Sequence, residues 1–232
     1  MIVSTVREYM MDNIFQNYNS QVWAPKELII ILNSDHLDIK KWKKEAKKYK
    51  NVAIYQLPNH ISLGECFNFA VKKAKYEVIS KMDDDDYYSP FYLSEQMQAL
   101  KEHPDVSLVG KNTVYTYIES KKALGILSAK KENRFDRRVK GPTMTFKKEI
   151  FKNIKFADKN LGTNKQFFKD CQEYGYKIYV TSKNNFVYIR RKEKDHTWKA
   201  DDELMFKKLR QVTYTDDFKS HVLLPIKGEN SK

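Results

Sequence analysis

The first half of the chain alternates short apolar segments with amphipathic ones, and this alternation restricts the possible folds more than any other feature. Residues 27–32 read Glu-Leu-Ile-Ile-Ile-Leu, nearly continuous in apolar side chains, as a parallel strand buried on both faces must be. Between such strands the apolar side chains recur at helical spacing. These βαβ repeats predict an α/β fold with an open, mostly parallel sheet flanked by helices. The predicted strands are residues 2–5, 27–32, 51–57 and 76–82, and the predicted helices are about 8–18, 37–49, 62–75 and 90–102.

The pattern changes after Pro104. Residues 106–119 and 123–128 alternate like strands around a turn at residues 121–122, which predicts an antiparallel extension of the sheet. Residues 130–140 are charged and have no apolar periodicity, so they are predicted to form a loop. The predicted organisation is one domain over residues 1–200, with halves at 1–105 and 106–200, followed by a helical and polar tail at 201–232.

The charge balance narrows the class of partner. Lysine and arginine number 43 against 30 acidic residues, a formal net charge of +13. Such an excess favours a polyanionic partner: a nucleic acid, a nucleotide, an anionic glycan or an acidic membrane surface. Cys66 and Cys171 lack the paired spacing of a zinc site or a secreted disulfide framework. With no apolar run near the roughly 18 residues of a membrane span, the sequence predicts a reduced, cytoplasmic protein whose membrane contacts are peripheral.

Four consecutive aspartates, Asp83 to Asp86, follow the predicted strand 76–82. In open parallel sheets, ligands bind at the carboxyl ends of the strands. Adjacent carboxylates repel one another unless a cation neutralises them, and Mg²⁺ or Mn²⁺ takes oxygen ligands from carboxylates, phosphates and water. Because side chains alternate along an extended segment, Asp83 and Asp85 should share one face, and Asp84 and Asp86 the other. One pair would then hold a metal and a ribose, and the other pair would fix the loop. An acidic surface turn is the alternative, but the position after a buried strand favours a ligand site.

Three segments, residues 27–33, 63–68 and 81–88, carry a resemblance to a known family. They resemble family 2 glycosyltransferases of the GT-A fold, closest to the bacterial members that build cell-envelope or spore-surface glycans. The resemblance covers about residues 1–200. It implies a Rossmann-like sheet with the nucleotide-sugar site in the first half and the acceptor site in the second. It also implies a Mn²⁺ or Mg²⁺ cofactor, with Asp85 as a metal ligand.

The same resemblance implies contacts to the donor. Residues at the end of the first strand stand where the family contacts the nucleotide, and Asn33 stands where an aspartate usually bonds the base. An arginine fork matches phosphate geometry, so Arg190 and Arg191 are implied to reach the leaving diphosphate. The implied donor-binding residues are Ser4, Thr5, Arg7, Asn33, Asp35, Asn68, Asp83, Asp84, Arg190 and Arg191, and the implied metal ligands are Asp83, Asp85 and His196.

On the acceptor side, residues 141–146 resemble the family's acceptor loop, and residues 175–178 resemble the turn after its catalytic helix. Just before that helix, most inverting members carry an acidic pair whose carboxylate deprotonates the acceptor hydroxyl. This chain reads Gly-Thr-Asn-Lys-Gln at residues 162–166 instead. Asp158 and Asp170 are the candidate replacements for the missing base.

The predicted function is metal-dependent transfer of a sugar, with inversion, from a UDP-linked nucleotide-diphospho-sugar to a hydroxyl of a cell-envelope or spore-surface glycan or a polyol-phosphate. The expected location is the cytoplasm, with peripheral contact at the inner face of the membrane or association with the spore. One alternative is a GT-A module that has lost activity and binds donor or scaffolds a glycan-synthesis complex, which the missing acidic pair favours. Another is a metal-dependent nuclease or nucleic-acid binder; the dispersed tyrosines and phenylalanines argue against it, because such proteins usually interleave basic residues with exposed aromatics.

Overall fold

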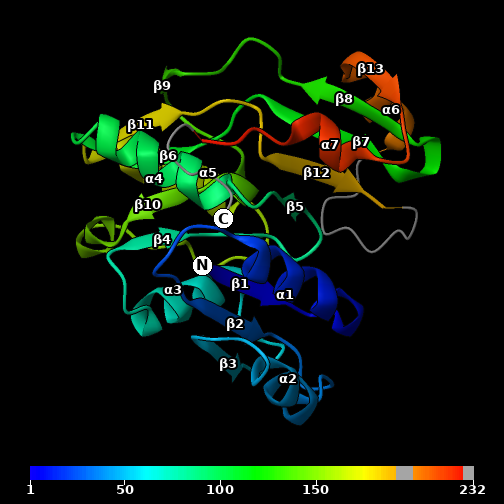
Figure 1. The fold of residues 1–232 in the computed structure, drawn as a ribbon. Helices are drawn as coiled ribbons and strands as arrows, with labels where there is room; N and C mark the ends of the chain where they lie inside the picture. Colours follow the sequence, from blue (N-terminus) through cyan, green and yellow to red (C-terminus); the bar gives the residue numbers. More distant parts are fainter. Residues whose placement is uncertain (192–200, 227–232) are drawn as a thin grey trace.

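The computed structural model describes residues 1–191 and 201–226 (Figure 1). The chain opens with three parallel strands, and β2 lies between β1 and β3. Every residue of β2 is buried, which confirms the prediction of a central strand covered on both faces. The elements of this part are β1 (Ile2–Thr5), the 3-10 turn η1 (Glu8–Met10), α1 (Met11–Ser20), β2 (Leu28–Leu32), α2 (Ile39–Ala46), β3 (Val52–Gln56) and α3 (Leu63–Lys73).

The main sheet continues from β1 into a mixed set of strands. Lys81 forms a parallel bridge with Ile2, and the N–H of Met82 donates to the Ile2 carbonyl at 3.0 Å. Beyond this link the order is β4, β10, β6, β11 and β9, with β10 antiparallel to both of its neighbours. The parallel part and the antiparallel extension are therefore both present. The bounds are β4 (Val78–Ser80), α4 (Tyr92–Glu102), β6 (Val106–Gly110), β9 (Arg134–Asp136), η3 (Gly141–Thr143), β10 (Thr145–Lys147), η4 (Lys148–Lys152), α5 (Thr163–Glu173) and β11 (Lys177–Val180).

A second sheet has the order β13, β8, β7, β12, β5. The prediction of one strand over residues 106–119 is wrong, because β6 lies in the main sheet and β7 in the second. Between them Lys111 is fully buried: its N–H donates to the Thr143 hydroxyl at 2.8 Å, and its ammonium pairs with Glu95 at 2.8 Å. The bounds are β5 (Tyr87–Tyr88), β7 (Val114–Ile118), η2 (Glu119–Lys121), β8 (Ala123–Leu127), β12 (Phe186–Arg190), α6 (Asp202–Lys208), β13 (Arg210–Tyr214) and α7 (Phe218–Val222).

Several predicted elements are shorter in the structure. The strand predicted at 76–82 has three regular residues in β4, and the helix predicted at 37–49 ends with α2 at Ala46. The helix predicted at 8–18 begins as the 3-10 turn η1 before α1. Two of the predicted helices start at side-chain caps: Asp38 accepts from N–H groups in the first turn of α2, and Ser62 accepts from the N–H of Glu65 in α3.

Residues 201–226 belong to the second sheet and its cover. β13 pairs with β8 as an antiparallel edge strand. The end of α7 is bonded to the residue before β12, where the N–H of Asn185 donates to the Val222 carbonyl at 2.8 Å. Within residues 1–191 and 201–226, no helix combines the length and apolar character needed to span a membrane.

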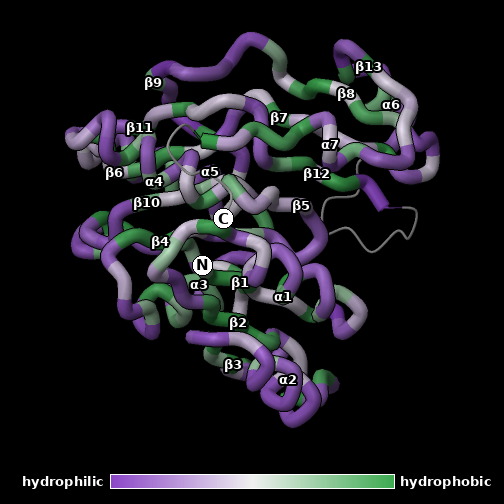
Figure 2. The backbone as a smooth tube through the Cα atoms, viewed as in Figure 1, coloured by the Kyte–Doolittle hydropathy of each residue, from purple (hydrophilic) through white to green (hydrophobic). Residues whose placement is uncertain are grey.

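Alternating side chains along β1 and β2 supply two hydrophobic cores, one on each face of the sheet. Ile2, Ile29 and Ile31 pack with buried side chains of α3 and α5. Their neighbours Val3 and Ile30 pack on the opposite face with α1 and α2. Figure 2 shows the result as hydrophobic strands inside hydrophilic outer segments. Because both faces are covered, the strand ends hold the loops that follow them in fixed positions.

The two cysteines lie in the first of these cores and are free. Burial raises the pKa of the Cys66 thiol to about 11 and that of Cys171 to about 12. Both groups are therefore neutral thiols that fill space in the core, which agrees with the expectation of reduced cysteines.

The start of α3 requires glycine at residue 64. The N–H of Gly64 donates to the Lys159 carbonyl at 3.1 Å, and a Cβ at this position would lie 1.9 Å from the Ala157 carbonyl oxygen. We expect Gly64→Ala to lower the free energy of unfolding by at least about 2 kcal/mol, because backbone on both sides must move apart. Urea denaturation measures this. Lys72→Ala, on the exposed face of the same helix, should stay within about 0.5 kcal/mol of the wild type; equal midpoints for the two variants would contradict the expectation.

Candidate active site

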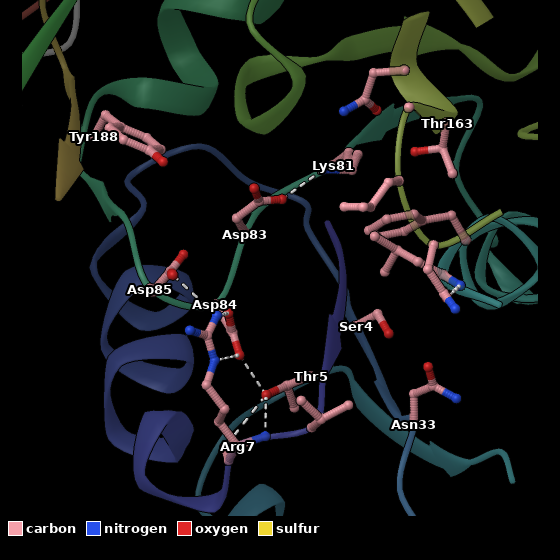
Figure 3. Close-up of a pocket in the computed structure, with 17 residues that line it drawn as sticks. Ser4, Thr5, Arg7, Asn33, Lys81, Asp83, Asp84, Asp85, Thr163 and Tyr188 are labelled. Carbon is pink, nitrogen blue, oxygen red and sulfur yellow. Dashed lines mark hydrogen bonds and ion pairs between the residues drawn. The ribbon is translucent and has the colours of Figure 1, made fainter. Parts of the chain in front are cut away.

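A cavity of about 370 Å³ opens where β1, β2 and β4 end (Figure 3). One wall is formed by residues 4–7 and Asn33, which follow β1 and β2. The aspartate loop forms the floor, and residues 160–164, at the start of α5, form the opposite wall. Strand ends and a helix start thus converge on one cavity at the carboxyl edge of the sheet, where ligands bind in folds of this kind.

Asp84 anchors the aspartate loop to the end of β1. It is 4% exposed and accepts hydrogen bonds from the Thr5 hydroxyl and from Arg7, whose Nε lies 3.1 Å from Oδ2. Burial raises the pKa of Asp84, while Arg7 and Thr5 stabilise its charged form and act in the opposite direction. Asp84 therefore ties the loop to Thr5 and Arg7.

Asp86 ties the same loop to the second sheet. Its side chain is fully buried, and Oδ1 accepts the N–H of Ile189 in β12 at 3.0 Å. The side-chain amides of Asn13 and Asn17 donate to its backbone carbonyl at 3.0 and 2.9 Å. Burial and then the charges of the neighbouring aspartates raise the pKa of Asp86 well above its usual range. The pair that fixes the loop is thus Asp84 and Asp86, although residues 84–86 form a turn and a bend and not the extended segment that was predicted.

Asp83 and Asp85 point into the cavity (Figure 3). Asp83 pairs with the ammonium of Lys81 at 2.6 Å, and Asp85 pairs with Arg7 at 3.0 Å. Lys81 is 2% exposed, and its Nζ lies 4.7 Å from the centroid of the Phe67 ring. Lys81 thus balances Asp83, while Arg7 is shared by Asp84 and Asp85, and both cations also line the cavity, where they can contact an anionic ligand.

The donor set of the cavity fits a hard divalent cation. Among the described residues, no group of three or more histidine, cysteine, aspartate or glutamate side chains is placed to hold a metal. Mg²⁺ and Mn²⁺, however, commonly use one or two carboxylates and complete their shell with substrate phosphates and water. Asp83 and Asp85 can supply those two carboxylates. His196, the third implied ligand, lies outside the described residues.

The other residues implied to bind the donor divide into two groups. Ser4, Thr5, Arg7 and Asn33 line the cavity. The Asn33 amide also donates to the Pro58 and Ile61 carbonyls at 2.9 and 3.1 Å, which holds the loop after β3.

The second group does not line this cavity. Asp35 contacts the N–H of Asn59 at 3.5 Å. Asn68 is 2% exposed and exchanges two hydrogen bonds of 2.9 Å with the backbone of Phe156, so it joins α3 to the segment before α5. Arg190 pairs with Asp202 at 3.0 Å, and Arg191 donates to the Asp85 carbonyl at 3.0 Å.

The wall formed by residues 160–164 carries an amide where the family resemblance implies an acid. α5 begins after Gly162, which has a φ of +77°, and Asn164 lies in its first turn. The Asn164 Oδ1 atom is buried and has no hydrogen-bond partner within the described part of the chain. Asp158 is exposed, Asp170 accepts a hydrogen bond from Gln166 at 2.6 Å, and neither lines the cavity.

The comparisons identify the family. The family model described as Glycosyl transferase family 2 matches residues 10–170, well over half of the chain. The chain belongs to glycosyltransferase family 2. The match includes the aspartate loop and the start of α5, while Ser4, Thr5, Arg7 and Tyr188 lie outside the matched range.

Named relatives agree with this assignment. The O-antigen biosynthesis glycosyltransferase WbnJ of Escherichia coli is 30% identical over 158 residues, 64% of this chain and 61% of WbnJ. The crystal structure of S. aureus TarS 1-349 in complex with UDP-GlcNAc has a TM-score of 0.67 at 18% identity, over 89% of this chain and 62% of that chain. The UDP complex of the same fragment has a TM-score of 0.65 at 16% identity, over 82% of this chain and 59% of that chain. These similarities confirm the GT-A fold, and the chain spans about three fifths of the length of WbnJ and of the TarS fragment.

Two side chains of this glycosyltransferase site were missed by reasoning from the sequence. Lys81 lies in the aspartate motif but was assigned no role, because lysines are seldom fully buried unless they are paired. Tyr188, from β12, lines the cavity opposite Lys81 (Figure 3), and burial raises the pKa of its hydroxyl above the usual range. The sequence carries no clear signal for Tyr188, because all other residues of β12 are buried and the burial pattern does not alternate.

Proposed function

We propose that this chain transfers a sugar from a UDP-linked nucleotide-diphospho-sugar to a hydroxyl of a cell-envelope glycan. The observation that carries the proposal is the pair Asp83 and Asp85, which face one cavity at the carboxyl edge of the sheet together with Arg7 and Lys81. Support comes from the family, from the name of WbnJ, and from TarS, whose fold this chain shares and whose structures contain UDP-GlcNAc and UDP.

The proposed cofactor is Mn²⁺ or Mg²⁺, with Asp83 and Asp85 as its ligands. Once bound, such a cation offsets the negative charge that develops on the leaving diphosphate. Arg7 and Lys81, which now balance the two carboxylates, lie within the same cavity and would contact the phosphate oxygens. Asp84 and Asp86, which bond the loop to β1 and β12, would keep Asp83 and Asp85 in place.

The proposed reaction is a direct displacement. The acceptor hydroxyl oxygen forms a bond to the anomeric carbon as the bond from that carbon to the diphosphate oxygen breaks, which inverts the configuration. The acceptor would enter past residues 160–164, since the aspartate loop occupies the donor side. The hydroxyl proton needs an acceptor group within hydrogen-bond reach. Within the described residues, the carboxylates of the cavity are Asp83, Asp84 and Asp85, which the proposal assigns to the cation and to the loop, so in the wild type the proton would pass to a water molecule.

The lack of an acidic pair at residues 163 and 164 favours the alternative of a module without efficient transfer. With Thr163 and Asn164 in place of an acidic pair, the chain would bind donor but transfer slowly, as a donor-binding or scaffolding module of a glycan-synthesis complex. The alternative of a nuclease or nucleic-acid binder has less support. Among the described residues, the cavity lining includes aromatic rings only at Phe67 and Tyr188, and neither is an exposed surface on which a base could stack.

Calorimetric titration of UDP, GDP, CDP and dTDP, each with and without Mn²⁺, tests the proposal. We expect UDP to bind in the micromolar range with Mn²⁺ and at least about 10-fold more weakly without it, because the diphosphate and the two carboxylates share the cation. The other nucleotides should bind more weakly than UDP. Release of UDP from UDP-sugars in the presence of acceptor then separates an enzyme from a donor-binding module. Absence of binding for every nucleotide would refute the proposed function in both forms.

A further inference from the structure

A second cavity, of about 780 Å³, adjoins the first and shares residues 161, 162 and 164 with it. Its walls are the connection from β8 to β10 on one side and the segment from Lys159 through α5 on the other. We call it the basic cavity, because six of its side chains are cationic and none is acidic within the described residues. The six are Lys131, Arg138, Lys140, Lys159, Lys165 and Lys169.

The fold leaves most of these charges without a carboxylate partner. Lys169 pairs with Glu173 at 3.3 Å. The other five form no ion pair with a carboxylate anywhere in residues 1–191 and 201–226. Nearby surface cations behave differently: Lys177 pairs with Asp105, and Arg134 pairs with Asp136. The positive charge at the basic cavity is therefore concentrated where the protein does not neutralise it.

The connection from β8 to β10 carries half of these cations and is held in place; residues 130–140, predicted as a loop, include strand β9. Thr113, which is fully buried, accepts the N–H of Lys131 at 2.9 Å and donates to the Ser128 carbonyl at 2.7 Å. The N–H of Lys140 donates to the Lys111 carbonyl at 2.6 Å. Figure 2 shows the connection between β8 and β9 as mostly hydrophilic. These charges thus sit on a connection bonded to the buried turn between β6 and β7, where they can form a preorganised surface.

The positive charge of Lys140 is unfavourable in this arrangement. It is partly buried, and its ammonium donates to the Ser128 hydroxyl at 3.2 Å. Burial lowers the pKa of Lys140, and the positive charges of Arg138 and Lys131 lower it further. Like charges that repel one another at the edge of a reaction site are stabilised by an anionic ligand.

We propose that the basic cavity binds the acceptor, and that this acceptor carries negative charges, as phosphodiester or carboxylate groups, on the units next to the reacting hydroxyl. The inference rests on the proposed function. It follows from continuity, because Gly162 and Asn164 line both cavities, so a chain bound in the basic cavity can present a hydroxyl to the donor. Nucleic acid fits less well: the one ring in the described lining is Phe168, which is 6% exposed and offers no stacking surface.

The test compares two double variants. Lys131→Gln with Arg138→Gln removes two exposed cations of the basic cavity, and Lys122→Gln with Lys177→Gln removes two exposed cations elsewhere. The probes are a glycerol-phosphate oligomer, a uronic-acid oligomer, a neutral glucan oligomer and a single-stranded DNA, each followed by calorimetry. UDP with Mn²⁺ is titrated into the same samples.

We expect one or both anionic glycan probes to bind the wild type, and the neutral glucan to bind at least about 10-fold more weakly. The cavity variant, Lys131→Gln with Arg138→Gln, should lose at least about 10-fold in affinity for the anionic probe. The slope of log affinity against log salt should fall by about 1.4 for two lost contacts. The control variant should keep its affinity, and UDP binding should be unchanged in both. The phosphate and uronate arms tell which anion is recognised.

Equal binding of neutral and anionic glycans, equal loss in both variants, or no anionic binding while UDP still binds would overturn the basic cavity as an anionic acceptor site. DNA bound more tightly than both anionic glycans, with the loss confined to the cavity variant, would replace it by a nucleic-acid site. If the wild type does not bind UDP but binds anionic glycans, and this glycan binding depends on Lys131 and Arg138, the proposed donor is refuted. The basic cavity would then still be an anion-binding site.

Discussion

Replacing Asp85 with asparagine is expected to lower sugar transfer by at least about 100-fold and to abolish the dependence of UDP binding on Mn²⁺. The substitution keeps the shape of the side chain and removes the charge that the cation and the diphosphate require. Thr5 and Arg7 keep their bonds to Asp84, so the loop remains attached to the end of β1. The negative charge of Asp85 raises the pKa values of Asp84 and Asp86. Its removal therefore lowers the electrostatic repulsion on these two carboxylates. Folding is therefore expected to be unharmed.

The measurement is calorimetry of UDP with and without Mn²⁺, followed by the transfer rate for both proteins. Asp105→Asn is the matched control, since Asp105 is exposed, pairs only with Lys177 among the described residues, and lies outside the cavity. A thermal unfolding curve for each variant excludes a folding defect. If Asp85→Asn binds UDP with the same Mn²⁺ dependence as the wild type, Asp85 is not a metal ligand, and the site must be assigned to other groups.

The sequence is a good guide wherever a local pattern reports burial. β2 is predictable because five successive apolar residues fit only an element covered on both faces. The aspartate loop is predictable because it follows a buried strand, and alternation predicts that its four aspartates divide into two pairs without telling which pair fixes the loop. Even there the local geometry differs: Asp84 and Asp86 are turned inward by bonds to Arg7 and Ile189, which are distant in sequence.

Pairing between distant segments is what the sequence does not report. Residues 106–119 keep one alternating pattern through two strands of different sheets, because periodicity records which side chains are buried and not which strand lies alongside. Asn68 shows the same limit at the level of one residue. Its motif resembles a donor-binding segment, yet its amide bonds to Phe156, 88 residues away, and holds α3 against the segment before α5.

Replacing Asn164 with aspartate is expected to raise the transfer rate at least about 10-fold, with UDP affinity unchanged within about twofold. Asn164 lines both cavities in the first turn of α5, and its buried Oδ1 has no hydrogen-bond partner among the described residues. A carboxylate there would face the entering hydroxyl, and a positioned base contributes roughly 10²- to 10⁴-fold. The helix N-terminus also favours a negative charge by about 0.3 to 1 kcal/mol. The transfer rate of Asn164→Asp should increase with pH as the new carboxyl group ionises. The wild type has no carboxyl group at this position, so its rate should not show this increase.

Three comparisons make the result decisive. Asn153→Asp makes the same chemical change at an exposed position outside both cavities and should leave the rate unchanged. Asp158→Asn and Asp170→Asn should also leave it unchanged, because neither carboxylate lines the cavity; a loss of about 100-fold in either would identify that residue as the base. If Asn164→Asp binds UDP but transfers no faster than the wild type, proton removal at residue 164 does not limit the reaction. If neither protein transfers at all while both bind UDP, the chain is a donor-binding module, because restoring the missing acid would then be insufficient to restore catalysis.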